Sequence, residues 1–586
     1  PARLRRCLVT QEFTHAGVYQ VRLCHGGEWK VVTVDDSFPV NAIGCLAYLK
    51  AARRQLWVPL LEKAYAKLHG CYEALEGGTF VEAFSTLTGM PVIRIHLSRY
   101  TPPEPPPAGA AEDVVAGHTR QMEKWKKLGL DTDELYVQMY SYKQAGYAVG
   151  ASTFARDANT EAELRAKGLN VPHAYSLIEV RTLDGGSGEE QLVKLRNPNG
   201  HAGWSGPWGR DSPLWTYDLK KEVGLDGEDS GVFWMRWDDF LTCFLEVTVC
   251  KLLPEEEYPQ HQEMRVGGWL PSAFNAGQAV SIDAFAHTRC ELSVYQEQHS
   301  ERGEGSFALL LDIGLTVLKK TTDGTWELVE TAERTLKPSC ALSVTLEQDA
   351  FATEYLVIPL CFGQLHSTEP RKFTVTAHAT QPLALEVVPL PAQLLREAAI
   401  AAAVKHGDRQ PLLKNGAGME ALVIYSYDEE GGYIIVAENV TPFPMQVGVD
   451  ASERTKGFFS SRGGTPEHPT LFTQDILPPF SRQILIVLTM NMKSKQHQLA
   501  MGYNGGSLDP GTVAPPGGAH IPDLEHLGAL QDLHKPQPSG ARAGQPNGGG
   551  GGAAPGGDPA AMAQLLAALM GAAAQQQQGQ NGQGNP

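Results

Sequence analysis

The sequence predicts an α+β chain of several domains, in which a mixed helical and stranded half precedes two β-rich domains. Three observations lead to this class. Helical and strand periodicities alternate up to about residue 252, short alternating runs dominate 255–390, and Gly, Pro, Ala and Gln dominate after 503. The length of 586 residues is enough for about three to five domains.

The N-terminal part begins with a predicted hairpin and a predicted helix. Residues 17–39 alternate apolar and polar side chains around a Gly-Gly turn, as two paired strands do. Leu56, Leu60 and Ala64 then recur at helical spacing. Gly70 follows this run and is a typical helix stop.

The middle and C-terminal parts are rich in predicted strands. Between 255 and 390, runs such as "CELSVYQE" and "KFTVTAHA" are separated by turn residues, and Asp323 and Gly324 form a strong hairpin signal. A β-sandwich is the natural interpretation. Residues 393–407 are strong helix formers, and the strands that follow predict a second small β-rich domain over 393–500.

The composition of the C-terminal segment, 503–586, predicts a disordered Gly/Pro/Gln-rich tail, because it offers too little apolar surface to offset chain entropy. The run "MAQLLAALMGAAA" within it is a candidate helix, and the tail is a candidate binding segment for other proteins.

The charge and cysteine content exclude several classes of protein. The formal net charge is −17, which argues against a nucleic-acid binder. No apolar run reaches the length of about 18 residues that a membrane span needs. The nine cysteines contain no CxxC pair, which favours reduced thiols and a cytoplasmic location. The chain begins at Pro1 with no start-like segment, so we expect it to be truncated at its N-terminus.

Two polar residues stand at the ends of neighbouring predicted strands, His173 in "VPHAYSLIEV" and Asn197 in "LVKLRNPNG". A histidine beside an apolar strand is more often a core side chain, and "RNPNG" alone is a common turn. Paired strands would nevertheless bring the two residues together. An imidazole oriented by an amide is typical of the base in a cysteine protease.

Several stretches, in order across about 17–252, resemble the calpain family of papain-like cysteine endopeptidases. They are "GEWKVVTVDDSFP", "LWVPLLEKAYAKLHGCYEALEGGTFVEAFSTLTG", "SYKQAGYAVGAS", "HAYSLIEVR", "LVKLRNPNG" and "GVFWMRWDDFLTCF". The resemblance implies limited intracellular proteolysis of protein substrates, with His173 as general base and acid and Asn197 as the residue that orients it. The stretches "YIIVAENV" and "LPPFSRQILIVL" are similar to the C-terminal domain of the non-conventional small-optic-lobes subfamily.

The resemblance gives each part of the chain an expected identity. The expected parts are the remainder of the first protease lobe (1–105), the second lobe with the His and Asn (106–252), a calpain-type β-sandwich (253–390), the small-optic-lobes-type domain (393–500) and the tail (503–586). The proline-rich run "TPPEPPPAGA" joins the two lobes of this partial papain-like core.

The sequence departs from the family most at the nucleophile. Calpains carry it in a Gly-x-Cys-Trp segment, and none of Cys7, Cys24 and Cys71 lies in such a segment. We therefore expect the nucleophile to lie upstream of Pro1 and the chain to be inactive alone. The alternative is a catalytically inactive calpain-like scaffold or substrate-binding protein. A sugar- or lipid-binding role for 255–390 is a third, weaker hypothesis.

Two substitutions beside the catalytic pair favour the scaffold. Pro172 stands where the family has Gly, and Asn199 stands where it has a Trp that shields the His–Asn bond. Without that Trp, we expect the bond to be wetter and weaker.

Calcium is the one cofactor that the resemblance implies. Glu82 matches a calcium-ligand position of the first lobe. In the second lobe, the acidic positions of the family fall on non-acidic residues, namely Gly203, Arg210, Ser230 and Val232. The nearby acids are more typical of a solvated loop; they are Asp226, Glu228 and Asp229. An oxygen cage with so few anions would bind calcium weakly.

Overall fold

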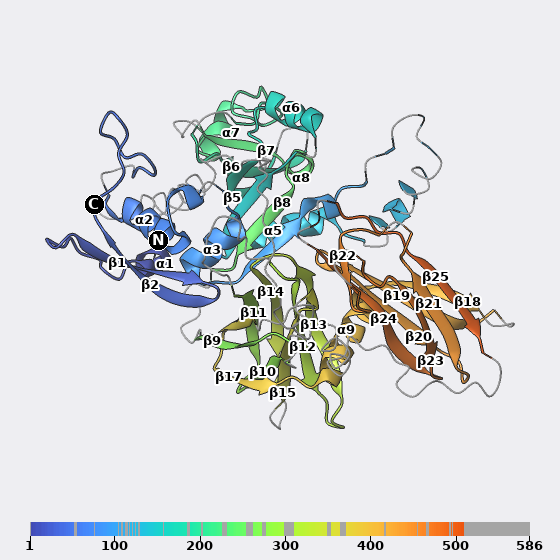
Figure 1. Ribbon diagram of the computed structural model, residues 1–586. Helices are drawn as coiled ribbons and strands as arrows, with labels where there is room; N and C mark the ends of the chain where they lie inside the picture. Colours follow the sequence, from blue (N-terminus) through green and yellow to red (C-terminus); the bar gives the residue numbers. More distant parts are fainter. Residues whose placement is uncertain are drawn as a thin grey trace, which may run out of the picture. The chain divides into compact units, whose positions relative to one another are not determined.

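The computed structural model describes residues 2–508 with gaps, the longest of which are 226–230, 253–261, 272–276, 298–309 and 364–370. Residues 509–586, which hold most of the expected tail and its "MAQLLAALMGAAA" run, lie outside the described residues. Two compact units emerge from the contacts (Figure 1). Of the described residues, the first contains those within 2–25 and 29–252, and the second contains 26–28 and those within 262–508.

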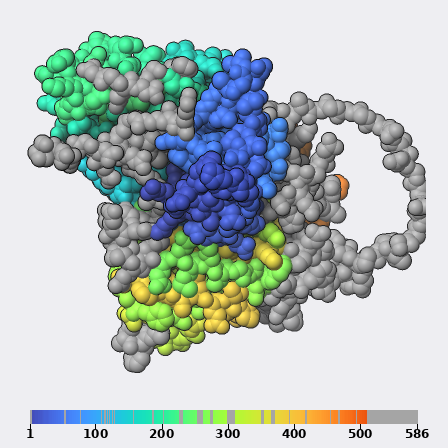
Figure 2. Space-filling view, turned by 90° about the vertical axis from the view of Figure 1, so that its left-hand side faces the viewer, coloured from blue at the N-terminus to red at the C-terminus, as the bar shows by residue number. Residues whose placement is uncertain are grey.

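The first unit opens with a hairpin and helices, as the sequence predicts. Its N-terminal elements are α1 (Ala2–Cys7), β1 (Val18–His25), β2 (Glu28–Asp35), α2 (Trp57–His69), the 3-10 turn η1 (Glu73–Leu75) and α3 (Phe80–Thr88). Helix α2 buries Leu60, Leu61 and Ala64 and ends at Gly70, whose φ of 107° suits glycine. These elements form the dark-blue and blue surface of Figure 2.

The rest of the first unit is built on a six-stranded antiparallel sheet of order β3-β8-β4-β5-β6-β7. Its strands are β3 (Val92–His96), β4 (Ala148–Thr153), β5 (His173–Asp184), β6 (Glu189–Arg196), β7 (Val232–Arg236) and β8 (Glu246–Cys250). The other elements are η2 (Leu97–Arg99), α5 (Thr132–Gln144), α6 (Ala158–Ala166), α7 (Tyr217–Glu222) and α8 (Trp237–Cys243). An apolar cluster that includes Tyr175, Phe233 and Val247 forms the core against this sheet.

The second unit begins with a sandwich of a five-stranded sheet (β13-β12-β15-β10-β17) and a four-stranded sheet (β14-β11-β16-β9). The strands are β9 (Gln262–Trp269), β10 (Gln278–Ala284), β11 (Thr288–Gln296), β12 (Ile313–Lys320), β13 (Trp326–Thr335), β14 (Ser339–Leu346), β15 (Glu354–Leu360), β16 (Lys372–Ala379) and β17 (Leu383–Pro389). Asp323 and Gly324 lie in the turn between β12 and β13, which confirms the predicted hairpin.

A second pair of sheets follows, of orders β18-β19-β20-β24-β22 and β23-β21-β25. The elements are α9 (Ala392–His406), β18 (Asp408–Lys414), β19 (Glu420–Glu429), β20 (Gly432–Asn439), β21 (Met445–Asp450), β22 (Phe458–Ser460), β23 (Phe472–Leu477), β24 (Ser481–Met490) and β25 (Gly502–Ser507). Strand β25 pairs with β21 beyond the boundary expected at residue 500. The sequence "GYNGGS" is too glycine-rich to read as a strand without its partner.

Helix α9 joins the two pairs of sheets into one core. It contacts β12, β13 and β15 of the sandwich and also β19, β20 and β24. Its alanines face both sides, and Ala398, Ala399 and Ala402 are fully buried. One hydrophobic cluster therefore contains Leu356 of the sandwich and Val423 of the C-terminal sheets. The two β-rich domains expected to be separate share this core, because a helix of small side chains lets both sheets approach it closely.

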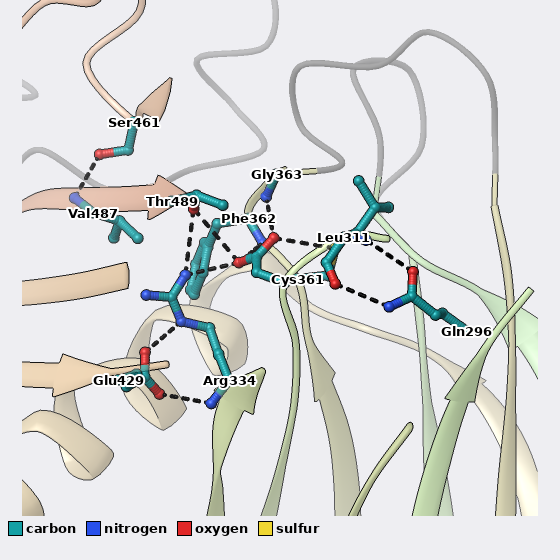
Figure 3. Close-up of polar contacts among 11 residues, drawn as sticks. Gln296, Leu311, Arg334, Cys361, Phe362, Gly363, Glu429, Ser461, Val487 and Thr489 are labelled. Carbon is teal, nitrogen blue, oxygen red and sulfur yellow. Dashed lines mark hydrogen bonds and ion pairs between the residues drawn. The ribbon is translucent and has the colours of Figure 1, made fainter. Parts of the chain in front are cut away.

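A buried ion network also crosses this joint (Figure 3). Arg334, near the end of β13, donates from Nη1 to Asp312 Oδ2 at 2.7 Å and from Nε to the Glu429 carboxylate. Asp312 also accepts the backbone N–H groups of Phe362, at 3.0 Å, and Gly363, at 2.6 Å. The three charged side chains are 0–1% exposed. Charged side chains from both pairs of sheets therefore lie together in one site that is buried from solvent.

Among the residues that the structure describes, every helix falls short of the length and apolar character that crossing a bilayer requires.

Candidate active site

The pairing of β5 with β6 brings His173 and Asn197 together. The strands are antiparallel, with Ser176 opposite Arg196, so the start of β5 and the end of β6 lie side by side at the same end of the sheet. His173 is the first residue of β5, and Asn197 directly follows β6. The distance between His173 Nε2 and Asn197 Oδ1 is 2.8 Å. The proximity expected from the sequence is therefore present.

The turn after β6 fixes the orientation of the Asn197 amide. The backbone N–H of Asn199 donates to Asn197 Oδ1 at 3.0 Å, so that atom must be the amide oxygen. An amide oxygen only accepts hydrogen bonds, and Nε2 of His173 must therefore carry the proton. In the neutral ring the lone pair is then on Nδ1, which is the nitrogen able to take a proton from a thiol.

Strand β7 supports the same turn from its start. The backbone N–H of Asn197 donates to the carbonyl oxygen of Gly231 at 2.8 Å, and Gly200 N–H donates to the Asn197 carbonyl at 3.1 Å. A Cβ atom at Gly231 would lie 2.7 Å from the Asn197 carbonyl oxygen. Only glycine fits at this position without moving the turn, a constraint that the sequence alone did not reveal.

The His–Asn hydrogen bond is buried, contrary to the expectation of a wetter bond. His173 is 6% exposed and Asn197 is 0% exposed, although Asn199 replaces the shielding Trp of the family. The Asn199 backbone closes the turn over the amide, and the ring of Tyr175 packs against the imidazole. Pro172 precedes His173 in a cis peptide bond with Val171. Low local polarity around the bond favours a firmly held ring.

The structure describes all nine cysteines, and several lie in surroundings that suppress the thiolate. Cys7 is fully buried and its Sγ lies 3.0 Å from the Leu87 carbonyl oxygen, and burial raises its pKa to about 12. Burial also raises the pKa of Cys243, Cys290 and Cys340. A catalytic thiol needs the opposite shift. These four residues are therefore unsuited to be the nucleophile.

Glu82 lies in the first turn of α3, where Thr79 Oγ1 caps the helix by accepting the Glu82 backbone N–H. The Glu82 carboxylate lies 3.8 Å from His69 Nε2. Among the described residues, no group of three or more His, Cys, Asp or Glu side chains is arranged to hold a metal ion. In the part of the chain that the structure describes, Glu82 thus lies beside a histidine and belongs to no group of three or more such ligands.

Three residues at the family's second-lobe acidic positions, Gly203, Arg210 and Val232, line a pocket of about 610 Å³. Among the described residues of this lining, Asp211 is the only acidic one. Calcium needs six to eight oxygen ligands with several carboxylates, and an arginine opposes a cation. The described residues do not fit calcium here. Ser230 and the acidic loop of Asp226, Glu228 and Asp229 lie outside the described residues.

Tyr175 and Thr153 are two further neighbours of His173, which the sequence motifs did not single out. Tyr175 follows His173 by two residues on β5, so the alternation of a strand places both on one face. Thr153 lies directly opposite His173 on β4. The two-residue spacing was a usable signal for Tyr175, whereas only the strand register reveals Thr153.

Two parts of the chain match known protein families. Residues 1–251 match the calpain family cysteine protease domain, and residues 402–506 match the calpain-D-like C-terminal domain. The calpain-type cysteine protease DEK1 of Zea mays is 34% identical over 288 residues, covering 48% of this chain and 12% of the relative. The calpain-type cysteine protease ADL1 of Oryza sativa subsp. japonica is 35% identical over 268 residues, covering 45% and 11%.

An animal relative matches in the same way. Calpain-A of Drosophila melanogaster is 30% identical over 318 residues, which is 51% of this chain and 34% of the relative. The chain thus spans between 11% and 34% of the length of these three relatives. The match of residues 1–251, together with these similarities, assigns the N-terminal unit: it belongs to the calpain family of cysteine proteases.

Proposed function

We propose that the chain supplies the His–Asn half of a calpain-type cysteine endopeptidase, which makes limited cuts in cytoplasmic protein substrates. The single observation that supports this most is the buried 2.8 Å contact between His173 Nε2 and Asn197 Oδ1. It gives the imidazole one orientation and one tautomer, which a general base requires. The family match of residues 1–251 supports the same reaction.

In the proposed reaction, Nδ1 of His173 takes the proton of a cysteine thiol that lies outside residues 1–586. The thiolate attacks the scissile carbonyl carbon, and the imidazolium returns the proton to the leaving amine. Water then gives a proton to the same imidazole and attacks the thioester, which releases the acid and regenerates the thiol. Asn197 accepts from Nε2–H throughout and keeps the ring in place.

We also place the chain in the small-optic-lobes subfamily of non-conventional calpains. The match of residues 402–506 to the calpain-D-like C-terminal domain supports this assignment. In this proposal the sandwich and the C-terminal sheets form one platform that recruits protein substrates. Calcium stays a candidate cofactor by resemblance to the family, and no step of the proposed reaction is assigned to it.

The test is to fuse a Gly-x-Cys-Trp-containing calpain segment upstream of Pro1 and to measure casein cleavage. Cleavage should occur and should fall by about 10²-fold or more in His173→Ala. The exposed His287, changed to Ala, is the matched control and should retain activity. A folded fusion without cleavage, or one whose cleavage survives His173→Ala, would contradict the proposal.

The alternative is a calpain-like scaffold that binds substrates without cutting them. The observation that favours it is that every cysteine with a resolved shift has a raised pKa. The transcript that encodes the residues before Pro1 separates the two functions. A cysteine at the Gly-x-Cys-Trp position supports the protease, and any other residue there supports the scaffold.

A further inference from the structure

We infer that Tyr175 is a positioning residue for His173, because its aromatic ring sets the plane of the imidazole that Asn197 anchors. The catalytic meaning of this inference rests on the proposed protease function. The positioning itself is a property of the folded chain and can be measured without any reaction.

The strand geometry puts the two rings side by side. His173 and Tyr175 are two residues apart on β5 and therefore point to one face of the sheet. Their ring centroids are 4.9 Å apart and their planes are at 88°. This edge-to-face arrangement is favourable for aromatic pairs. Tyr175 is thus a second neighbour that packs against the imidazole, in addition to Asn197.

Tyr175 is itself held rigidly by the core. It is 0% exposed. The centroid of its ring lies 5.9 Å from that of Phe233, with an angle of 86° between the ring planes. It meets Phe244 at 5.4 Å with an angle of 78°. Both phenylalanines belong to the core cluster of the sheet. The Tyr175 ring has three edge-to-face neighbours, His173, Phe233 and Phe244, and has little freedom to turn. A fixed Tyr175 ring in turn limits how far the His173 ring can rotate.

The hydroxyl group of Tyr175 supports the segment that leads into His173. Its Oη accepts the backbone N–H of Asn170 at 2.7 Å. Thr153 Oγ1 lies 2.7 Å from the Asn170 carbonyl oxygen and 3.2 Å from that of His173. The pairing of β5 with β4 begins at His173, which lies opposite Thr153. Hydrogen bonds made by the side chains of Tyr175 and Thr153 therefore hold the residue Asn170, which lies before the paired part of β5.

The two contacts of His173 restrict different motions. The hydrogen bond to Asn197 fixes the position of Nε2 but allows the ring to tilt about that atom. The packed ring of Tyr175 opposes the tilt and so determines where Nδ1 points. Burial raises the pKa of Tyr175 far above its usual value, so the phenol stays neutral and adds no charge beside the imidazole.

The experiment uses the full chain with ¹⁵N-labelled histidine and follows the His173 ring nitrogens by NMR across a pH titration. The His173→Gln variant assigns the signals. We expect wild type and Tyr175→Phe to show a single Nε2–H tautomer, since Phe keeps the ring. In Tyr175→Leu we expect the two nitrogen shifts to move toward the average of the two tautomers. A folded Tyr175→Leu chain with unchanged His173 shifts would overturn the inference.

Tyr136 offers a matched control. It lies in the same core, packs edge-on against Trp237 at 5.5 Å, and its hydroxyl lies 3.0 Å from Thr182 Oγ1. Tyr136→Leu removes a comparable buried ring and should leave the His173 tautomer unchanged. If it alters the His173 shifts as much as Tyr175→Leu does, general loosening of the core explains both, and the inference fails.

Two further readouts keep the test decisive. Should Tyr175→Leu fail to fold, Tyr175→Met retains bulk without an aromatic ring and should show the same averaging. In the fused enzyme, Tyr175→Leu should lower kcat by about tenfold and leave KM within about twofold, because substrate contacts are unchanged. An inactive wild-type fusion would refute the proposed function, whereas the NMR result would stand or fall by itself.

Discussion

Arg334 of the β-sandwich and Glu429 of the C-terminal sheets form an ion pair with side-chain exposures of 0% and 1%. Asp312 completes the site and lies 2.7 Å from Arg334 Nη1. Figure 3 shows the guanidinium of Arg334 beside the carboxylate of Glu429 and the ring of Phe362. The Phe362 ring centroid lies 5.0 Å from Arg334 Cζ. The two β-rich parts are therefore joined by buried charge as well as by the apolar core around α9.

Replacing Arg334 with Met should strongly destabilise the second unit. The change leaves Asp312 and Glu429 without a cation in a site closed to water, and such losses cost about 3–5 kcal/mol. Urea unfolding followed by tryptophan fluorescence measures the effect. Arg409→Met is the matched control, because Arg409 pairs with Glu420 at the surface and should change stability little. Equal losses in the two variants would contradict the prediction.

Glu429→Gln should be tolerated better than Asp312→Asn. One cation between two carboxylates leaves one negative charge in excess, and burial raises the pKa of Glu429. Asp312 is the better anion because it accepts the N–H groups of Phe362 and Gly363. The negative charge of Glu429 is therefore the less well stabilised of the two, and its removal should cost less. The larger loss in Asp312→Asn is measured by urea unfolding at about pH 7.

The burial of Glu429 also predicts how stability changes with pH. Because burial raises the pKa of Glu429 in the folded state, stability should fall as the pH rises above the ordinary value of about 4.5 toward the folded pKa. Glu429→Gln should flatten this fall above about pH 4.5. The nearby titratable groups are Cys361, whose Sγ lies 3.7 Å from Asp312 Oδ1, Cys340, on which Glu429 acts electrostatically, and Glu430, which accepts from Thr335. An unchanged slope in Glu429→Gln would contradict the prediction.

Much of the fold follows from local sequence. The hairpin of residues 17–39, the helix that stops at Gly70 and the turn at Asp323 and Gly324 each depend on neighbouring residues, and each is present in the structure. The proximity of His173 and Asn197 was also predictable, because a hairpin brings the two strand ends together.

The joint between the two β-rich parts was not predictable in this way. Asp312, Arg334 and Glu429 are far apart in the sequence, and each resembles an ordinary surface charge until the strands are assembled. Alanine side chains do not mark one face of α9 as polar and the other as apolar, so the sequence does not indicate which face is buried. From its sequence, this helix, which is buried on two sides, resembles an ordinary linker helix. Long-range packing, which no local pattern encodes, decides these features.

Calcium should leave the stability of the chain unchanged. The described residues contain no cluster of acidic ligands, and the pocket of Arg210 has one acidic lining residue. A bound ion would raise Tm by stabilising only the folded state. Differential scanning fluorimetry in calcium chloride and in EDTA should therefore give the same Tm, with magnesium chloride as the control for ionic strength. A rise specific to calcium would contradict this prediction.

Gly231→Ala should disturb the hydrogen bond between His173 and Asn197, although Gly231 takes no part in that bond. The new Cβ would lie 2.7 Å from the Asn197 carbonyl oxygen and 2.9 Å from Gly200 Cα, so the turn that carries the Asn197 amide must shift. We expect a lower Tm, altered His173 ¹⁵N shifts and slower casein cleavage by the fused enzyme. Gly77→Ala is the matched control, since a Cβ there meets nothing within 4 Å. Unchanged His173 shifts in a folded Gly231→Ala chain would show that the turn adapts without moving the amide. A loss of Tm with intact His173 shifts would separate the structural role of Gly231 from its support of Asn197.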